Sequence, residues 1–119
     1  MKLATGSHSG TGVWLLQRAT AVLLAVALPV LLVLFLLAMP RDFAAWQALL
    51  APVWIRIVLL LAGASLALHA WAGMRDIFMD YVHLLGARLT LLLIVMTVLS
   101  ACVVWLAALL FGTPLWSGA

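Results

Sequence analysis

Three long stretches without a charged residue limit what this 119-residue chain can fold into. They lie between Arg18 and Arg41, between Arg56 and Arg75, and after Arg88. A transmembrane helix needs about 20 predominantly apolar residues, and each stretch approaches or exceeds that length. Because hydrocarbon offers no partner to free backbone N–H and C=O groups, stretches this long favour helices over open strands. The sequence therefore predicts an all-α membrane protein with three transmembrane helices.

The composition argues against a soluble fold. Hydrophobic residues make up 69% of the chain and charged residues 8%, whereas soluble domains are about half apolar and about a quarter charged. A small domain keeps a large part of its surface exposed, so a chain of this size could not hide so much apolar surface from water. Lipid is therefore expected to surround most of the protein surface. The six basic residues are scattered singly, so nucleic acid is not an expected partner.

The charged residues and prolines outline a single membrane-anchor domain covering residues 1–119. The three spans are predicted at about residues 13–39, 53–75 and 88–111. Residues 1–12, rich in Ser, Gly and Thr, are expected to form a polar tail that is flexible or held by a partner. The short connections between the spans imply antiparallel neighbours.

Local signals add detail to this outline. Pro29 lies inside the first span, where it removes a helix hydrogen bond and is expected to produce a kink. Residues 42–52 are expected to form an interfacial loop or a short helix. The second helix is expected to start near Pro52, because proline suits the first turn of a helix, and it could run through Arg75 and beyond. Residues 76–87, which carry two acidic side chains, are expected to form a loop.

The positive-inside rule predicts the orientation of the chain. Four basic residues fall on one side of the predicted spans and two on the other: Lys2, Arg18, Arg75 and Arg88 against Arg41 and Arg56. This places the N-terminus in the cytoplasm, or its organellar equivalent, and the C-terminus on the outer side of the membrane. Tryptophan is enriched at membrane interfaces, and its positions favour the same span ends: Trp14 at the inner interface, and Trp46, Trp54 and Trp116 at the outer one.

His69 lies inside the second predicted span. An ionisable side chain within a bilayer is costly and is by default a candidate for function, and a neutral imidazole can bind a metal. Its helix face is made mostly of small residues: Ala62, Ser65, Ala72, Gly73 and Asp76. Either a flat macrocycle approaches this face with His69 as its axial ligand, or the small residues allow close packing and His69 hydrogen-bonds to a neighbouring helix.

The other histidines, His8 and His83, lie in polar segments outside the spans. A six-coordinate haem at His69 would therefore need its second ligand from a different chain, which predicts a hetero-oligomer. The third span carries a stripe of small residues that is most simply a helix-packing face: Thr90, Thr97, Ala101 and Ala108.

Short motifs point to a family. The second span and its flank contain the run His69-Ala70-Trp71-Ala72-Gly73-Met74, followed by Asp80-Tyr81-Val82. The first span contains Arg18-Ala19-Thr20, and the third opens with Arg88-Leu89. In their order and placement, these motifs resemble the hydrophobic membrane-anchor subunit of bacterial succinate dehydrogenase, the small-subunit family of cytochrome b556. The resemblance covers most of the chain, including all three spans.

The resemblance implies roles for four residues. His69 would be one axial ligand of the iron of a b-type haem, and the other ligand would come from the companion anchor subunit. Arg18 would lie near the haem propionates. Tyr81 would donate a hydrogen bond to a carbonyl of ubiquinone, which a phenol hydroxyl can do. Asp80, beside it, would tune Tyr81 or help to relay protons.

The resemblance also implies partners. The chain would be part of a larger helical bundle with the companion anchor subunit and would anchor an iron–sulfur subunit and a flavoprotein subunit in a heterotetramer. Electrons from succinate would pass through flavin and iron–sulfur clusters to ubiquinone. The chain has a single cysteine and no dinucleotide-binding motif, so no activity is expected from it alone.

Other functions remain open on the sequence alone. The chain could be the anchor subunit of a fumarate reductase, which belongs to the same class of complex. It could also be a structural or assembly membrane protein without a cofactor. A small transporter with His69 as a proton site is less favoured, because transporters usually pair their intramembrane charges or contain repeats and broken helices.

Overall fold

The computed structural model describes residues 3–112, with side chains from residue 11 onward. Within this range the chain is helical and contains no strand. It forms α1 (Leu3–Ala38), α2 (Phe43–Leu50), α3 (Val53–Tyr81) and α4 (Leu85–Phe111). Three segments are long and apolar enough to cross a membrane: Thr11–Ala38, Val53–Tyr81 and Leu85–Phe111. The predicted all-α class with three candidate spans is confirmed.

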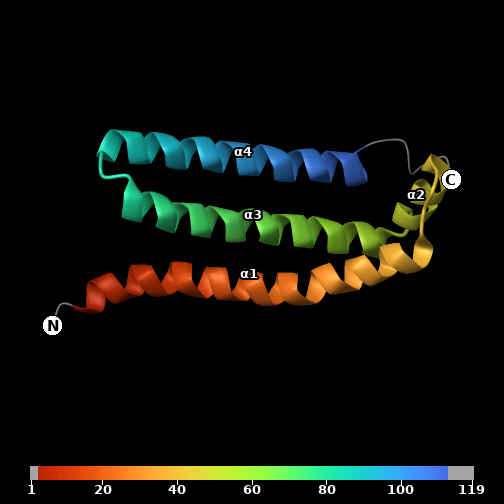
Figure 1. Ribbon diagram of the computed structural model, residues 1–119, viewed down its shortest axis with the longest axis horizontal. Helices are drawn as coiled ribbons and strands as arrows, with labels where there is room; N and C mark the ends of the chain where they lie inside the picture. Colours follow the sequence, from red (N-terminus) through yellow and green to blue (C-terminus); the bar gives the residue numbers. More distant parts are fainter. Residues whose placement is uncertain (1–2, 113–119) are drawn as a thin grey trace.

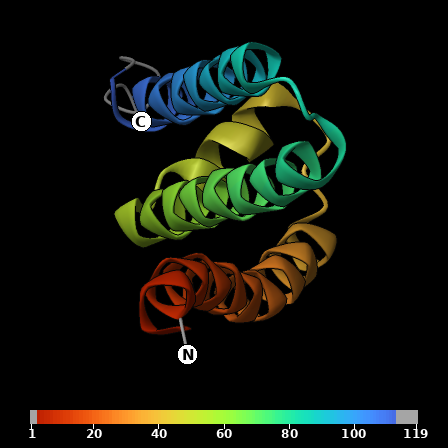
Figure 2. The ribbon, with the colours of Figure 1, turned by 90° about the vertical axis from the view of Figure 1, so that its left-hand side faces the viewer.

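The three long helices form an open row with α3 in the middle. Helices α1 and α4 pack on opposite sides of α3, and successive long helices run antiparallel (Figures 1 and 2). The short helix α2 lies at the end of the row where α1 leads into α3 (Figure 1). Since α3 alone has a long neighbour on two sides, it positions the other elements and carries most of the candidate site.

Helix α1 begins earlier than the sequence predicts. It already includes Leu3, so residues 3–12 are helical, although a polar tail was expected there; residues 1–2 lie outside the described part. Nucleation is the costly step of helix formation. Here the long apolar segment forms the nucleus, and the helix then extends from it. Ser, Gly and Thr have low helix propensity but cost only a fraction of a kcal/mol to about 1 kcal/mol each, so the helix can extend through them.

Pro29 lies inside α1 without ending it. The helix turns towards α3 in its second half, the region that contains this proline (Figure 1). This agrees with the expected kink. A proline bend is tolerated in a membrane helix where neighbouring helices and local backbone adjustments compensate for the lost hydrogen bond.

The segment between α1 and α3 forms the short helix that was one of the two expected alternatives. Helix α1 ends before Met39, which has a positive φ of 44°, and Pro40 follows it. Asp42 then caps α2, since one carboxylate oxygen accepts a hydrogen bond from the Ala45 N–H at 2.7 Å. The rings of Phe35 and Trp46, with centroids 5.5 Å apart, connect the end of α1 to α2.

The expected loop over residues 76–87 is wrong. Helix α3 continues to Tyr81 and α4 begins at Leu85, so only residues 82–84 connect them. Charged residues mark where a helix leaves the hydrocarbon, but they do not end the helix. No proline or glycine interrupts the chain between Gly73 and Gly86, so the backbone remains helical beyond the apolar part of the span.

Gly63 lies directly against α4. A Cβ atom placed there would collide with the side chain of Leu106 on α4. At the end of the row that holds α2, the guanidinium of Arg56 donates to the backbone carbonyls of Leu110, at 3.1 Å, and Ala51, at 2.9 Å. It also lies over the ring of Phe111. This arginine therefore joins the start of α3 to the end of α4.

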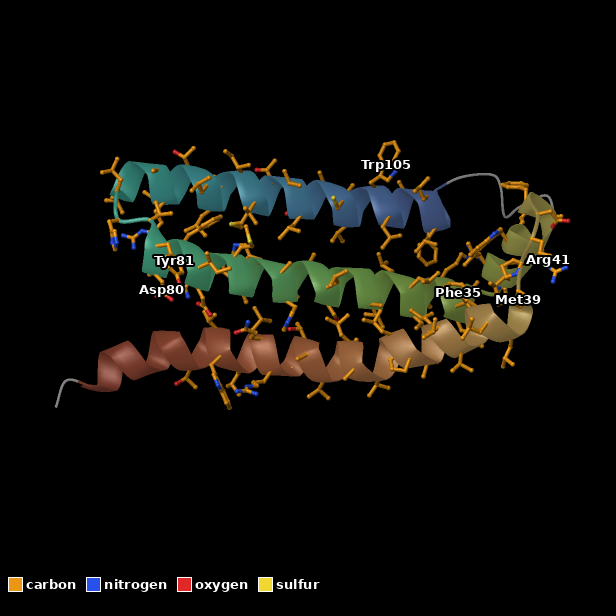
Figure 3. All side chains as sticks on the ribbon, viewed as in Figure 1. Phe35, Met39, Arg41, Asp80, Tyr81 and Trp105 are labelled. Carbon is orange, nitrogen blue, oxygen red and sulfur yellow. The ribbon has the colours of Figure 1, made fainter. Side chains whose placement is uncertain are left out.

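Most apolar side chains point outward. The buried apolar side chains of the described residues are few: Leu24, Leu31, Ile55, Ala62, Ala72 and Leu110. Large exposed side chains cover all three long helices, and Trp105 projects from α4 on the side away from α3 (Figure 3). A surface of this kind is stable only in contact with lipid or with another apolar protein surface.

The basic residues separate along the row as predicted. Arg75 and Arg88 lie at the end where α1 begins, and Arg41 and Arg56 lie towards the opposite end. Lys2 and Trp116, which also support the predicted orientation, lie outside the described residues. Arg18 belongs to the first group but lies well inside α1 and not at its end.

Candidate functional site

His69 lies in the second half of α3, and its ring faces α1. The ring nitrogen Nδ1 is 3.2 Å from the hydroxyl oxygen of Thr20 on α1. The imidazole is half-buried, so the contact with α1 covers one part of the ring and leaves another part accessible. Of the two sequence-based interpretations, the hydrogen bond to a neighbouring helix is present, and it does not occupy the whole imidazole.

Thr20 is a buried polar residue within an apolar helix, with 5% of its surface exposed. Its hydroxyl oxygen lies 2.8 Å from the carbonyl oxygen of Leu16 and 3.1 Å from that of Gln17. Threonine hydroxyls in helices commonly bond to backbone carbonyls three or four residues earlier. The sequence motif Arg18-Ala19-Thr20 contained this residue, but without a structure nothing indicated that it would face His69.

The small-residue face around His69 is covered by α1. Ser65 and Ala72 are buried, and a Cβ atom at Gly73 would lie 3.9 Å from the side-chain amide nitrogen of Gln17 on α1. Of the two interpretations of this face, the structure shows close helix packing, because the small side chains allow α1 to approach. A bound planar group would have to reach the exposed part of the His69 ring from the edge of the α1–α3 pair.

Arg18 is exposed on α1, and its guanidinium lies 5.2 Å from the centre of the Trp14 ring on the same helix. It precedes Thr20 by two residues, so the two side chains project to nearly opposite sides of α1. The structure therefore brings Arg18 to the same depth as His69 but does not place their side chains in contact.

Asp80 and Tyr81 occupy the last turn of α3, at the opposite end of the row from Arg41 (Figure 3). Both are exposed, and Tyr81 has 78% of its surface exposed. At a rise of about 1.5 Å per residue, Tyr81 lies about 18 Å along the helix from His69. His69, the expected haem ligand, and the residues expected to contact quinone therefore lie at two separate levels of α3.

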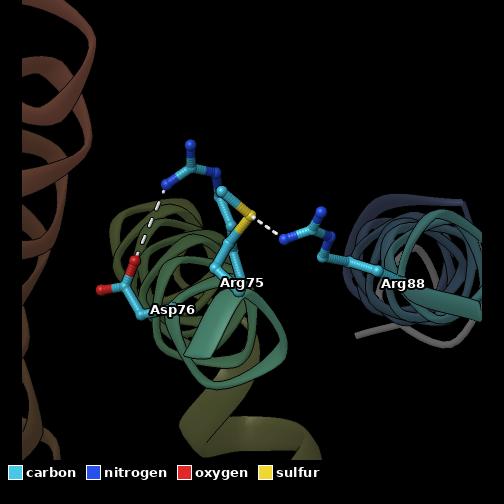
Figure 4. Close-up of polar contacts among 4 residues, drawn as sticks. Arg75, Asp76 and Arg88 are labelled. Atoms are coloured by element: carbon cyan, nitrogen blue, oxygen red, sulfur yellow. Dashed lines mark hydrogen bonds and ion pairs between the residues drawn. The ribbon is translucent and has the colours of Figure 1, made fainter. Parts of the chain in front are cut away.

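Two arginines lie near this second group. Arg75 forms an ion pair with Asp76 at 3.7 Å, and Arg88 of α4 donates to the sulfur of Met79 at 3.6 Å (Figure 4). The contact between Arg88 and Met79 joins α3 to the start of α4 around a short connection. The sequence indicated Arg88 through its motif, but not its contact with Met79, because a thioether carries no recognisable signal for an arginine partner.

A separate apolar groove of about 500 Å³ lies between α3 and α4. Its lining includes Leu68 and Trp71 from α3 and Met96 and Val103 from α4. Trp71 follows His69 by two residues and so projects to a different side of α3. The groove therefore does not open onto the side of α3 that His69 shares with α1.

Comparison with known proteins decides the family. Residues 2–108 match the family described as succinate dehydrogenase/fumarate reductase transmembrane subunit. The chain belongs to this family. A relative from Coxiella burnetii, the succinate dehydrogenase hydrophobic membrane anchor subunit, is 34% identical over 99 residues, which cover 83% of this chain and 86% of the relative.

Family membership confirms the predicted resemblance and indicates what the three spans do. As a succinate dehydrogenase/fumarate reductase transmembrane subunit, the chain is a multi-pass membrane anchor within an oxidoreductase complex. The matched region contains all four residues to which the sequence motifs assign a role: Arg18, His69, Asp80 and Tyr81.

Proposed function

We propose that this chain is one of two membrane-anchor subunits of a succinate:ubiquinone oxidoreductase, and that it shares a b-type haem and the ubiquinone-reduction site with partner subunits. The observation that carries the proposal is His69, an imidazole inside a candidate span, with one nitrogen held by α1 and part of the ring accessible. In a member of this family, such a ring is suited to bind iron at the edge of the chain.

The donor set around His69 fits an iron shared between chains. Within residues 11–112, whose side chains the structure describes, no three side chains among His, Cys, Asp and Glu are close enough to hold a metal ion. A metal at His69 would therefore need further ligands from a macrocycle and from another subunit. His69 would bind the iron as one axial ligand, and the companion anchor subunit would provide the second. When bound, the haem supplies a centre that accepts and releases one electron.

Arg18 would contact a carboxylate of the haem near this depth of the membrane. Its guanidinium is exposed on α1, two residues from the partner of His69. A guanidinium can bind a carboxylate through two parallel hydrogen bonds, which suits a haem propionate that reaches the side of α1 facing away from α3. Thus α1 would contribute two polar side chains near the haem, Thr20 towards α3 and Arg18 towards the surface.

The end of α3 has the properties that a ubiquinone-reduction site needs. The Tyr81 hydroxyl is exposed and can donate a hydrogen bond to a quinone carbonyl. Reduction of a quinone to a quinol takes up two protons, so the site must have access to water. Asp80, exposed beside Tyr81, would pass protons towards the quinone or orient the phenol.

The open row of helices supports the proposed partners. The predicted packing stripe of α4 is exposed along its whole length, at Thr90, Thr97, Ala101 and Ala108. Small side chains allow helices to approach closely within a membrane, so this stripe suits a helix of the companion anchor subunit. The iron–sulfur subunit, which carries the flavoprotein subunit, would lie on the cytoplasmic side of the bacterial inner membrane, at the Tyr81 end.

The family also includes transmembrane subunits of fumarate reductase. The His69 motif favours the haem-containing, succinate-oxidising type. The direction of catalysis depends on the potentials of the whole complex. No succinate chemistry is expected from this chain alone, because it lacks the cysteine clusters and the dinucleotide-binding motif that iron–sulfur and flavin sites require.

A spectrum of the purified complex tests the proposal. The reduced-minus-oxidised difference spectrum should show a low-spin b-type haem, and His69→Ala should abolish this signal or convert the haem to a high-spin form. His83→Ala, which changes an exposed histidine outside the three spans, is the matched control and should leave the spectrum unchanged. A wild-type complex without haem, or a His69→Ala complex with the wild-type spectrum, would refute the proposal.

A further inference from the structure

We infer that Thr20 is the positioning residue for His69: its hydroxyl oxygen accepts a hydrogen bond from Nδ1–H, which fixes the tautomer and leaves the lone pair of Nε2 for iron. This inference rests on the proposed function, because it assigns a role towards the haem. It starts from the 3.2 Å contact between Thr20 on α1 and His69 on α3.

The two carbonyl oxygens beside the Thr20 hydroxyl favour one direction of the bond. The Thr20 hydroxyl has one proton and can accept through its oxygen lone pairs. Carbonyl oxygens only accept, and the hydroxyl lies 2.8 Å from that of Leu16, a typical distance for O–H···O bonds. With its proton directed at this carbonyl, the hydroxyl can only accept from the imidazole. Nδ1 must then carry the hydrogen, and in the neutral ring Nε2 is unprotonated.

The surroundings of the contact leave few alternatives for Nδ1. Thr20 is buried, so water does not compete for its hydroxyl. The nearest polar side chain along α1, Gln17, lies against Gly73, one helical turn from His69. Among the described residues, Thr20 is the side chain that the structure places within hydrogen-bonding distance of the imidazole.

The consequence for a bound metal follows from general coordination chemistry. A metal-binding histidine usually donates its other N–H to an acceptor, which fixes the orientation of the ring and raises the basicity of the ligand; loss of that acceptor typically lowers metal affinity about 10–100-fold. A more basic imidazole stabilises ferric iron over ferrous iron. Removal of the Thr20 hydroxyl should therefore weaken haem binding and shift the haem midpoint potential to a more positive value.

Threonine substitutions in the purified complex test this inference. Thr20→Val has nearly the same shape as threonine but no acceptor, whereas Thr20→Ser keeps the hydroxyl. Thr20→Ser is therefore the matched control, because it keeps the oxygen at the same position of α1 and differs from threonine only by a methyl group. The measurements are haem content relative to flavin, haem affinity by titration with hemin, and midpoint potential by redox titration.

The expected result is specific to the hydroxyl of Thr20. Thr20→Val should lower haem affinity about 10–100-fold and raise the midpoint potential. Thr20→Ser should match the wild type in both values. Reduction of an artificial acceptor by succinate reports on whether the soluble subunits remain intact. Should valine prevent assembly, Thr20→Ala removes the same oxygen without adding a methyl group in its place.

Two failures are distinguishable. If Thr20→Val retains wild-type affinity and potential while His69→Ala loses the haem, the role of Thr20 is wrong and the proposed function stands. If the wild-type complex contains no haem, or His69→Ala keeps it, the proposed function fails first. A loss of affinity without any change in potential would indicate a packing effect alone and would also overturn the inference.

Discussion

The guanidinium of Arg56 donates a hydrogen bond to the backbone carbonyl oxygen of Leu110 at 3.1 Å, and so connects the first turn of α3 to the last turn of α4. The last carbonyls of a helix lack partners within the helix, and a positive charge near them is favourable. In the sequence, Arg56 is only one of six basic residues that set the orientation. In the structure it also holds the start of α3 against the end of α4.

Arg56→Leu should destabilise the assembled anchor. Hydrogen bonds that involve a charged group contribute about 1.5–3 kcal/mol each, and Arg56 donates to two carbonyls. Arg56→Lys should recover part of the loss, because an ammonium group keeps the charge but lacks the planar fork of donors. Thermal unfolding of the detergent-solubilised complex measures the effect. Arg41→Leu, at an exposed site, is the control, and an equal loss in both variants would contradict the prediction.

Tyr81→Phe should impair ubiquinone reduction and leave the fold intact. The side chain is exposed, so little packing changes when the hydroxyl is removed. A net hydrogen bond is worth about 1 kcal/mol, which corresponds to about a fivefold rise in the KM for ubiquinone. The measurement compares succinate-dependent reduction of ubiquinone with reduction of an artificial acceptor. Equal effects on both acceptors would separate Tyr81 from the quinone site.

Arg18→Gln should weaken haem binding. The loss of a charge-assisted hydrogen bond to a propionate costs about 1.5–3 kcal/mol, and each 1.4 kcal/mol corresponds to about a tenfold change in affinity. We therefore expect a decrease of about 10–100-fold in a hemin titration of the complex. Arg41→Gln removes an exposed arginine at the opposite end of the row and should have no effect on haem. Unchanged affinity in the Arg18 variant would exclude the propionate contact.

Met39→Gly should stabilise the end of α1. Met39 has φ of 44°, a left-handed conformation that costs a residue with a Cβ atom about 1–2 kcal/mol and that glycine adopts readily. Part of this gain is offset by the larger conformational entropy of glycine in the unfolded chain, so we expect a net gain of about 1 kcal/mol in thermal unfolding. Met39→Ala retains the Cβ atom and should not stabilise; a gain there would point to the side chain instead.

The number and approximate positions of the spans could be predicted from the sequence because charge is expensive in hydrocarbon. The same signal failed at the helix ends. The acidic residues Asp76 and Asp80 favour a loop in the sequence, whereas α3 continues through both, because leaving the bilayer does not require a helix to end. The predicted polar tail failed for a related reason, since a long helix extends at low cost once it has formed.

The individual residues of the candidate site could be predicted from the sequence, but the contacts between them could not. His69 could be recognised from its cost in lipid, and Tyr81 and Asp80 from their motif. The contact between His69 and Thr20 could not, because their separation by 49 positions in sequence says nothing about which faces of two apolar helices meet. The small residues around His69 were compatible both with a ligand and with a neighbouring helix, and only the structure shows that α1 occupies that face.

His69 and Tyr81 belong to one unbroken helix, so α3 fixes the distance between them. A bilayer that is thicker or thinner than the apolar span is accommodated largely by tilting or by local changes in lipid. Tilting would move the Tyr81 phenol relative to the lipid headgroups. The distance along α3 between the His69 imidazole and this phenol would stay the same. The distance between the proposed haem ligand and the proposed quinone-binding residue therefore does not depend on the lipid composition of the cell.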